Sequence, residues 1–403
     1  MKITAVETIT LGEYPNVLWV QIHTDEGLVG LGETFYAVAP VAEHIHETCA
    51  PYLLGRDALR IEAISRNFLN TYLGFNSVGA EMRAASAIDI ALWDLFGQVT
   101  GQPIYQLLGG ACHDRVRVYN TCAGYEYVRA KPVQGTANFG LPEKPAGRER
   151  PYEDLLAFKT DAGALAESLL EMGIRGMKIW PFDEAAEASN GTDISTADLK
   201  KALRPFEQIR KAVGDRMDIH VEFHSLWQLP AAIRIAQALE PFQPYWYEDP
   251  IKMNNLDALA DYARRTRVWV TASEVLGTRW AFRELLQKQA VSVCMLDVGW
   301  TGGLSEAKKI STMAEAYALP VAPHDCTGPV LLTASVHLAM SCPNTLVQEM
   351  VRAFYYDWYG KLVTALPPVE NGTIRAPEGP GLGTRLQPGL AQRKDARVRV
   401  SRL

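Results

Sequence analysis

Cysteine is scarce in this chain of 403 residues. Its six cysteines, at positions 49, 112, 122, 294, 326 and 342, show no metal-ligand spacing and are too few and scattered for a disulfide framework. A reducing compartment is therefore expected. The start, MKITAVETITLG, has the pattern of a strand and not of a signal peptide, and no apolar run reaches the roughly 18 residues of a membrane span. The sequence thus predicts a cytoplasmic protein without a membrane anchor.

The sequence also lacks a concentration of basic residues. The formal net charge is −6 and there is no basic stripe, which argues against nucleic acid as a partner. An apolar content of 48% is ordinary for a globular protein and argues against disorder. The length is sufficient for a full barrel and a smaller second domain.

What the chain does contain is a regular series of apolar segments that end in acidic residues or histidine. Between residues 218 and 349 these ends are Glu222, Glu248, Glu274, Asp297, His324 and Glu349. The first two intervals are 26 residues each, and the others lie between 23 and 27. About 25 residues make one strand, one helix and two loops, so this period predicts a (β/α) barrel.

Three glutamates end three successive predicted strands. The carboxyl ends of barrel strands meet at one mouth, so Glu222, Glu248 and Glu274 should converge there. Buried carboxylates repel one another unless a cation lies between them, and an all-oxygen site suits Mg²⁺. The sequence therefore predicts a magnesium site formed by these glutamates. Asp249, next to Glu248, is expected to point away from the barrel centre.

Histidines accompany these carboxylates. Alternation along DIHVEFH puts His220, Glu222 and His224 on one face of a strand. The deeper His220 is expected to be an interior histidine, whereas His224, nearest the carboxyl end, should meet substrate. Asp297 and His324 end consecutive strands, and a carboxylate beside an imidazole fixes its tautomer and raises its basicity.

The motifs WYEDP, LDVGWTGGLSEAKKI and APHDCTGP, in this order and spacing, resemble the mandelate racemase subgroup of the enolase superfamily. The resemblance covers nearly the whole chain. It implies an α/β fold, a modified TIM barrel (β/α)7β with an N-terminal α+β capping domain. The expected ranges are 1–115 for the capping domain, 116–375 for the barrel, and 376–403 for a C-terminal segment that returns to the cap. The family's third-strand ligand is usually Asp, where this chain has Glu222.

The N-terminal pattern agrees with a cap. Residues 1–39 are expected to form a three-stranded antiparallel meander, with turn or bulge signals at glycines 27, 30 and 32. Helices are expected over 40–54, 59–73 and 80–100. Loops at 12–16, 33–39 and 72–79 are candidates to cover the barrel mouth. Two later segments have the pattern of long loops: 123–152, which is either a lid or a surface excursion, and 183–196.

The resemblance also implies roles for individual residues. With Asp297 as its partner, His324 would remove the proton α to a carboxylate. His224 would protonate the departing β-hydroxyl, because its position resembles that of the general acid in acid-sugar dehydratases. Glu349 would hydrogen-bond the substrate carboxylate as it becomes an enediolate, and Lys178 would help to hold that carboxylate.

The second barrel strand departs from the racemases of the subgroup. They have K-x-K where this chain has Lys178-Ile179-Trp180, and Trp180 cannot take a proton. Trp180 and Arg279 are expected to bind substrate, although a surface role for Arg279 is equally open. The leading expectation is a Mg²⁺-dependent sugar-acid dehydratase, a hydro-lyase that forms a 2-keto-3-deoxy sugar acid and assembles as a homo-oligomer. The alternatives are an epimerase or cycloisomerase of a sugar acid on the same scaffold, and a non-catalytic ligand-binding barrel.

Overall fold

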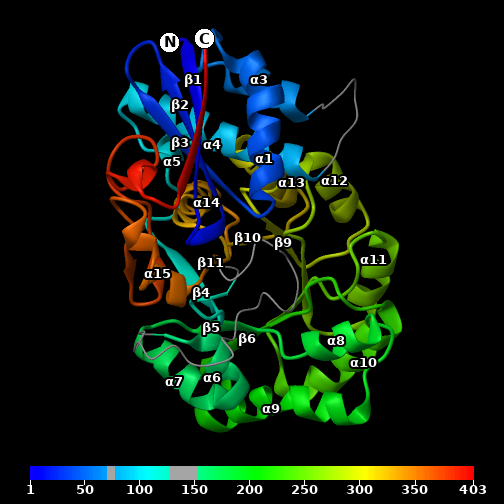
Figure 1. Cartoon of the computed structure of the whole chain (residues 1–403). Coiled ribbons are helices and arrows are strands. Elements are labelled where there is room, and N and C mark those ends of the chain that lie inside the picture. Colours follow the sequence, from blue (N-terminus) through cyan, green and yellow to red (C-terminus); the bar gives the residue numbers. More distant parts are fainter. Residues whose placement is uncertain (70–77, 128–151) are drawn as a thin grey trace.

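The structure is a computed structural model that describes residues 1–69, 78–127 and 152–403. At the top of Figure 1, an antiparallel sheet has the strand order β14-β1-β2-β3. Its strands are β1 (Ile3–Leu11), β2 (Tyr14–Thr24), β3 (Val29–Phe35) and β14 (Ala396–Arg402). The predicted meander is thus present. Because β14 pairs with β1, the last strand of the chain returns to the capping sheet and both termini lie there (Figure 1).

Helices follow β3 in the chain, and the longest of them, α4 (Ala80–Thr100), packs directly against β2 and β3. The others are α1 (Val38–His44), the π-helix η1 (Ile45–Cys49), α2 (Ala50–Leu53), α3 (Ile61–Leu69) and α5 (Ile104–Leu107). The helix predicted over 40–54 is therefore two α-helical pieces, α1 and α2, joined by a π turn. The prediction for α4 is confirmed, and Gly101 ends it in the left-handed region at φ 67°.

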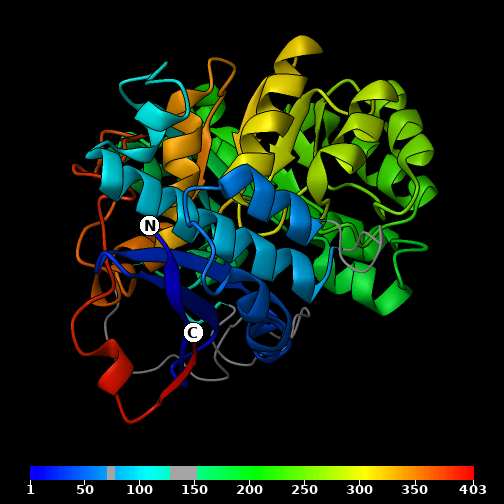
Figure 2. The ribbon, with the colours of Figure 1, turned by 90° about the horizontal axis from the view of Figure 1, so that it is seen from above.

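Two glycines of β3 have a different role from the predicted one. Gly27 does form a turn, at φ 76°. Gly30 and Gly32, however, lie under α4, where an added Cβ would overlap the carbonyl oxygens of Ala91 and Ala87. These two glycines let the helix approach the sheet closely, and this brings α4 to its place above the barrel (Figure 2).

Within the described residues, eight parallel strands form the barrel below the cap. They are β4 (Val116–Thr121), β5 (Gly176–Ile179), β6 (Asp218–Glu222), β7 (Trp246–Glu248), β8 (Trp269–Ala272), β9 (Val293–Leu296), β10 (Val321–Pro323) and β11 (Gln348–Met350). Neighbours pair in chain order from β4 to β10, and β11 pairs with β4. Leu346, just before β11, donates its N–H to the carbonyl of Val321 in β10 at 2.8 Å. β11 is thus joined to β10 on one side and to β4 on the other, which closes the barrel.

The barrel strands alternate with helices on the outside. These are α6 (Asp154–Thr160), α7 (Ala162–Glu171), α8 (Asp183–Ser189), α9 (Thr196–Val213), α10 (Leu229–Leu239), α11 (Leu256–Arg265), α12 (Thr278–Gln287), α13 (Gly303–Ala316), α14 (Pro329–Ser341) and α15 (Arg352–Tyr355). The polar stretch predicted as a loop over 183–196 contains α8. Short pieces complete the chain: η3 (Gly214–Arg216), η4 (Glu240–Phe242), η5 (Tyr359–Lys361), β12 (Val369–Glu370), β13 (Thr373–Ile374) and η6 (Leu390–Gln392).

Aromatic side chains fill the lower part of the barrel. His220 is 2% exposed, stacks on Tyr119 with ring centroids 4.5 Å apart, and meets Trp246 edge-on. The prediction of an interior histidine is therefore confirmed. In the described part of the chain, the helices are too short or too polar to cross a membrane.

Candidate active site

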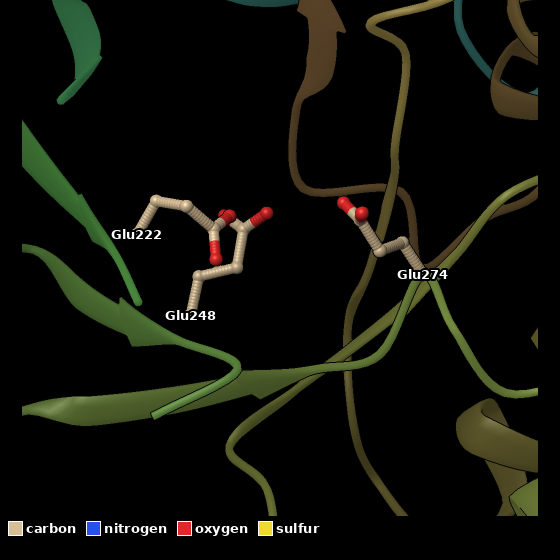
Figure 3. Close-up of side chains that lie close together, drawn as sticks. All are labelled: Glu222, Glu248 and Glu274. Atoms are coloured by element: carbon tan, nitrogen blue, oxygen red, sulfur yellow. The ribbon is translucent and has the colours of Figure 1, made fainter. Parts of the chain in front are cut away.

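The three predicted glutamates meet at the barrel mouth. Glu222 ends β6, Glu248 ends β7, and Glu274 follows β8 by two residues. One carboxylate oxygen from each lies within 4.8 Å of the other two. Figure 3 shows Glu222 and Glu248 side by side, with Glu274 facing them across a gap. The equal strand spacing thus brings three carboxylates to one point.

A buried lysine supplies part of the positive charge. Lys178 Nζ lies 2.5 Å from Glu248 Oε1, 2.9 Å from Glu349 Oε1 and 3.3 Å from Glu222 Oε2. Burial alone would lower the pKa of Lys178, but the carboxylates of Glu248 and Glu349 outweigh it and raise the pKa well above its usual value. One ammonium therefore faces three carboxylates, and Glu274 lies beyond them.

This cluster fits a hard divalent cation. Burial and the neighbouring Glu222 raise the pKa of Glu248 well above its usual range, so negative charge here lacks compensation. The buried Oε2 of Glu222 accepts no hydrogen bond from the described residues. Carboxylate oxygens are the ligands that Mg²⁺ prefers. The three glutamates have the chemistry and the proximity to hold such an ion.

His324 lies between two carboxylates. Its Nδ1 is 2.6 Å from Asp297 Oδ2 and its Nε2 is 2.8 Å from Glu274 Oε2. Burial lowers the pKa of His324, but Glu274, Glu349 and the hydrogen bond to Asp297 together raise it well above its usual value. For Glu274, burial acts in the opposite direction and raises the pKa, but the charge of His324 prevails and holds the pKa of Glu274 at about 2. The predicted pairing of Asp297 with His324 is present.

His224 has a carboxylate partner that sequence reasoning missed. Asp183, the first residue of α8, places Oδ2 at 2.7 Å from His224 Nδ1. Burial works against the charged imidazole, yet Asp183 and Glu222 raise the pKa of His224 to about 9. The available signal was the helical pattern of DEAAEAS, which puts Asp183 at the start of a helix at the mouth.

Both histidines line one cavity of about 230 Å³. β6 and β10 are four strands apart in an eight-stranded barrel, so His224 and His324 approach the cavity from opposite sides. Lys178 and Trp180 also line it, and the rings of Trp180 and His224 meet edge-on at 5.7 Å. The cavity therefore places two titratable imidazoles on opposite faces of whatever it binds.

The expectation for Asp249 is wrong. Its backbone is left-handed at φ 42°, so the alternation of the strand breaks after Glu248 and two successive side chains face the mouth. Asp249 lines the cavity and accepts a 2.8 Å hydrogen bond from the hydroxyl of Ser273. Burial, with Glu222 and Glu274 nearby, raises the pKa of Asp249 well above its usual range. The site thus contains one more acidic group than predicted.

Two further predicted residues lie in different surroundings. Glu349 is fully buried and accepts hydrogen bonds from the Thr121 hydroxyl and from the N–H of Asp325. Arg279 does not line the cavity. It stands in the first turn of α12, which faces α13, and its Nε–H donates to Glu306 Oε2 at 3.0 Å.

Aromatic residues outside the predicted set complete the wall. Tyr36, Tyr127 and Trp300 line the cavity, and the rings of Tyr36 and Trp300 lie 5.9 Å apart. Tyr36 belongs to the segment 33–39, which was expected to cover the mouth. Tyr127 belongs to the segment 123–152 considered as a lid, but residues 128–151 lie outside the described part of the chain. Residues 72–77 of the predicted cover loop 72–79, and the end of the helix predicted over 59–73, lie outside it too.

Comparisons with known proteins agree with this geometry. Residues 3–109 match the family "Mandelate racemase / muconate lactonizing enzyme, N-terminal domain", and residues 161–390 match "Enolase C-terminal domain-like". The chain is 31% identical to a D-xylonate dehydratase from Haloferax volcanii, over 96% of this chain and 87% of the relative. It is 30% identical to a D-galactonate dehydratase from Ralstonia nicotianae, over 97% and 93%.

A solved structure resembles the whole molecule. An enolase of the mandelate racemase subgroup from Agrobacterium tumefaciens is 51% identical, with a TM-score of 0.87 and coverage of 100% of this chain and 99% of the other. The two family matches cover the capping domain and the barrel, and the solved structure matches both together. The chain belongs to the enolase superfamily, in its mandelate racemase/muconate lactonizing enzyme subgroup.

Proposed function

We propose that this protein is a Mg²⁺-dependent sugar-acid dehydratase, a hydro-lyase that produces a 2-keto-3-deoxy sugar acid. One observation carries the proposal: His224 and His324, each hydrogen-bonded to its own carboxylate, line opposite sides of one cavity. Dehydration needs a base at the α-carbon and an acid at the β-hydroxyl. The named sugar-acid dehydratases among the relatives support this reading.

Glu222, Glu248 and Glu274 would hold the cation, which supplies positive charge for the substrate carboxylate and for the enediolate formed from it. Lys178, among these carboxylates, is placed to help orient the same carboxylate end of the substrate. Glu349 lies 2.9 Å from Lys178 and would meet that end from the last strand. The acidic end of the substrate therefore lies deepest in the cavity.

The α-proton goes to Nε2 of His324. Asp297 accepts from Nδ1 and so keeps the tautomer whose Nε2 faces the cavity. Glu274, one of the three residues that would hold the cation, lies 2.8 Å from Nε2 and would stabilise the imidazolium formed when Nε2 takes the proton. Proton removal leaves an enediolate, whose electrons expel the β-hydroxyl in the next step.

The leaving hydroxyl receives its proton from His224. Asp183 holds Nδ1, which leaves Nε2 as the donor. A pKa raised to about 9 by Asp183 and Glu222, against the effect of burial, keeps this imidazole protonated near neutral pH. The resulting enol then tautomerises to the 2-keto acid. Trp180, which adjoins His224, offers no second base for an epimerisation.

A sugar-acid library tests the proposal directly. Each acid is incubated with the protein and Mg²⁺ in D₂O, while 2-keto acid formation and the α-proton signal are followed separately. Elimination of water from at least one acid is the expected result. Inversion or ring opening without 2-keto acid would instead establish the epimerase or cycloisomerase alternative. Binding of an acid with neither exchange nor product would establish the non-catalytic alternative.

A further inference from the structure

α13 and α14 are among the barrel helices that begin without a capping side chain of their own. α13 is preceded by Gly302 and α14 by Gly328, and neither helix has a side-chain N-cap bond from that position. α7, α9 and α11 differ, because Asp161, Ser195 and Asn255 accept the N–H of the third helical residue in each case. The first N–H groups of α13 and α14 need partners from elsewhere.

The capping domain provides the partner for α13. Asp89 of α4 accepts the N–H of Ser305 at 2.9 Å with Oδ2, and the Ser305 hydroxyl at 2.6 Å with Oδ1. Ser305 is the third residue of α13, the usual donor to an N-cap side chain. A Cβ on Gly303 would overlap the Asp89 side chain, so glycine leaves the space that this carboxylate fills.

The same arrangement recurs at α14. Glu33 of β3 is fully buried, and its Oε1 accepts the N–H of Leu331, the third residue of α14, at 3.0 Å. Its Oε2 accepts the indole N–H of Trp19 at 2.7 Å, which fixes the carboxylate to the capping sheet. A Cβ on Gly328 would overlap Glu33 Oε1. Each helix is thus capped by a carboxylate distant in the sequence.

These two helices follow Asp297 and His324, the hydrogen-bonded pair called the dyad below. α13 follows β9 and Asp297, and α14 follows β10 and His324. Thr34, next to Glu33, adds a 3.3 Å hydrogen bond to the carbonyl of Gly299, whose N–H donates to Asp297 Oδ1. The capping domain therefore contacts the chain just after Asp297 and just after His324.

We propose that Glu33 and Asp89 are positioning residues, through which the capping domain sets the alignment of His324 with Asp297. Carboxylates at helix N-termini are stabilised by the helix dipole and by the N–H groups they accept. Removing either would let the start of its helix, and the dyad residue before it, shift. The inference rests on the proposed function only for its kinetic readout.

A rescue experiment separates capping from general packing. Gly328 has φ −128° and ψ 170°, a conformation open to any residue and typical of an N-cap. Glu33→Ala empties the space beside Gly328. An added Gly328→Asp can then cap α14 from the N-cap position of the helix itself. The same rescue is not available at α13, because Gly302 and Gly303 are left-handed at φ 114° and 82°.

Two readouts are compared. The first is the proton on His324 Nδ1 in its 2.6 Å bond to Asp297, followed by NMR at low field and assigned by its loss in His324→Asn. The second is kcat against KM. Glu33→Ala should weaken or shift the signal and lower kcat by about tenfold or more, with KM changed less. Adding Gly328→Asp should restore both.

The control is Asp94→Asn. Asp94 lies on the same helix as Asp89, is similarly buried, and accepts N–H groups of Leu31 and Leu382, neither of which is at the start of α13 or α14. It should lower the melting temperature but leave the His324 signal unchanged. An Asp94→Asn effect on the signal equal to that of Glu33→Ala would overturn the proposal. So would a double variant that is unfolded or keeps an altered signal. Should no sugar acid be turned over, the proposed function fails, while the NMR comparison still decides positioning.

Discussion

Asp183 Oδ2 lies 2.7 Å from Nδ1 of His224, although 41 residues separate them in the chain. This contact gives His224 a carboxylate partner, as Asp297 does for His324 on the opposite side of the cavity. Each imidazole thus has a carboxylate hydrogen-bonded to Nδ1, and the other neighbours distinguish the two histidines. Glu274 contacts only the second of them by a direct ion pair.

Asp183→Asn should slow dehydration by about 10²-fold, within the range that acid–base assistance contributes. The amide no longer stabilises a proton on His224, so the donor to the leaving hydroxyl is weakened. Initial rates of 2-keto acid formation measure the effect. Asp193→Asn, at an exposed carboxylate near Arg234, is the matched control and should retain the parent rate. Equal rates for Asp183→Asn and the parent would contradict this role.

The two histidines should fail differently. His324→Asn should lose both α-proton exchange and dehydration, because the enediolate never forms. His224→Asn should lose dehydration by about 10²–10⁴-fold while still exchanging the α-proton with solvent. Incubation of the true substrate in D₂O, with the α-proton and the 2-keto product followed by NMR, separates the steps. Persistent exchange in His324→Asn would show that another group is the base.

Because Trp180 stands in place of the second lysine of K-x-K, the protein should not racemise by the two-base route of the subgroup's racemases. The Trp180 indole lies edge-on to His224 at 5.7 Å and cannot accept a proton from carbon. We therefore expect no efficient interconversion of two α-epimers of one acid. Chiral chromatography of each epimer after long incubation tests this, and a 1:1 mixture formed at a rate near that of turnover would refute it.

Chelation should abolish activity, and Mg²⁺ should restore it. Binding of an ion to the native state also raises the melting temperature, by mass action. Glu222→Gln removes one of the three clustered carboxylates, so it should reduce that rise as well as the activity. Asp215→Asn, in the exposed η3 turn, is a control that keeps the parent response. Full activity in a thoroughly chelated sample would show that the cation has no catalytic role.

A buried ion pair joins the first residue of α15, Arg352, to the first residue of α6, Asp154. Arg352 donates from Nε and Nη2 to the two carboxylate oxygens of Asp154, both at 2.8 Å. Arg352→Ala should cost about 3–5 kcal/mol of unfolding free energy, because Asp154 is left charged and buried. Replacing both residues together, with Arg352→Met and Asp154→Leu, should cost much less. Urea denaturation gives both values, and similar losses in the two variants would argue against this explanation.

The sequence by itself determined the parts of this protein that depend on local period. An interval of 23 to 27 residues between acidic or histidine strand ends is enough to place Glu222, Glu248 and Glu274 at one mouth, since every barrel strand points the same way. The N-terminal meander and the bounds of α4 follow from short-range patterns as well. Because each of these signals is either a pattern within one strand or helix or a spacing along the chain, no knowledge of distant contacts is needed.

Only the tertiary structure decided which distant groups meet. Asp183 joins His224 because α8 begins at the mouth, and Asp249 turns inward because its backbone is left-handed. Glu33 lies 298 residues before Leu331, and nothing in either local pattern connects them. Such contacts depend on the position of the capping domain relative to the barrel. Many packing interactions between the two surfaces determine that position together. A local period carries no information about those interactions, whereas the folded chain does.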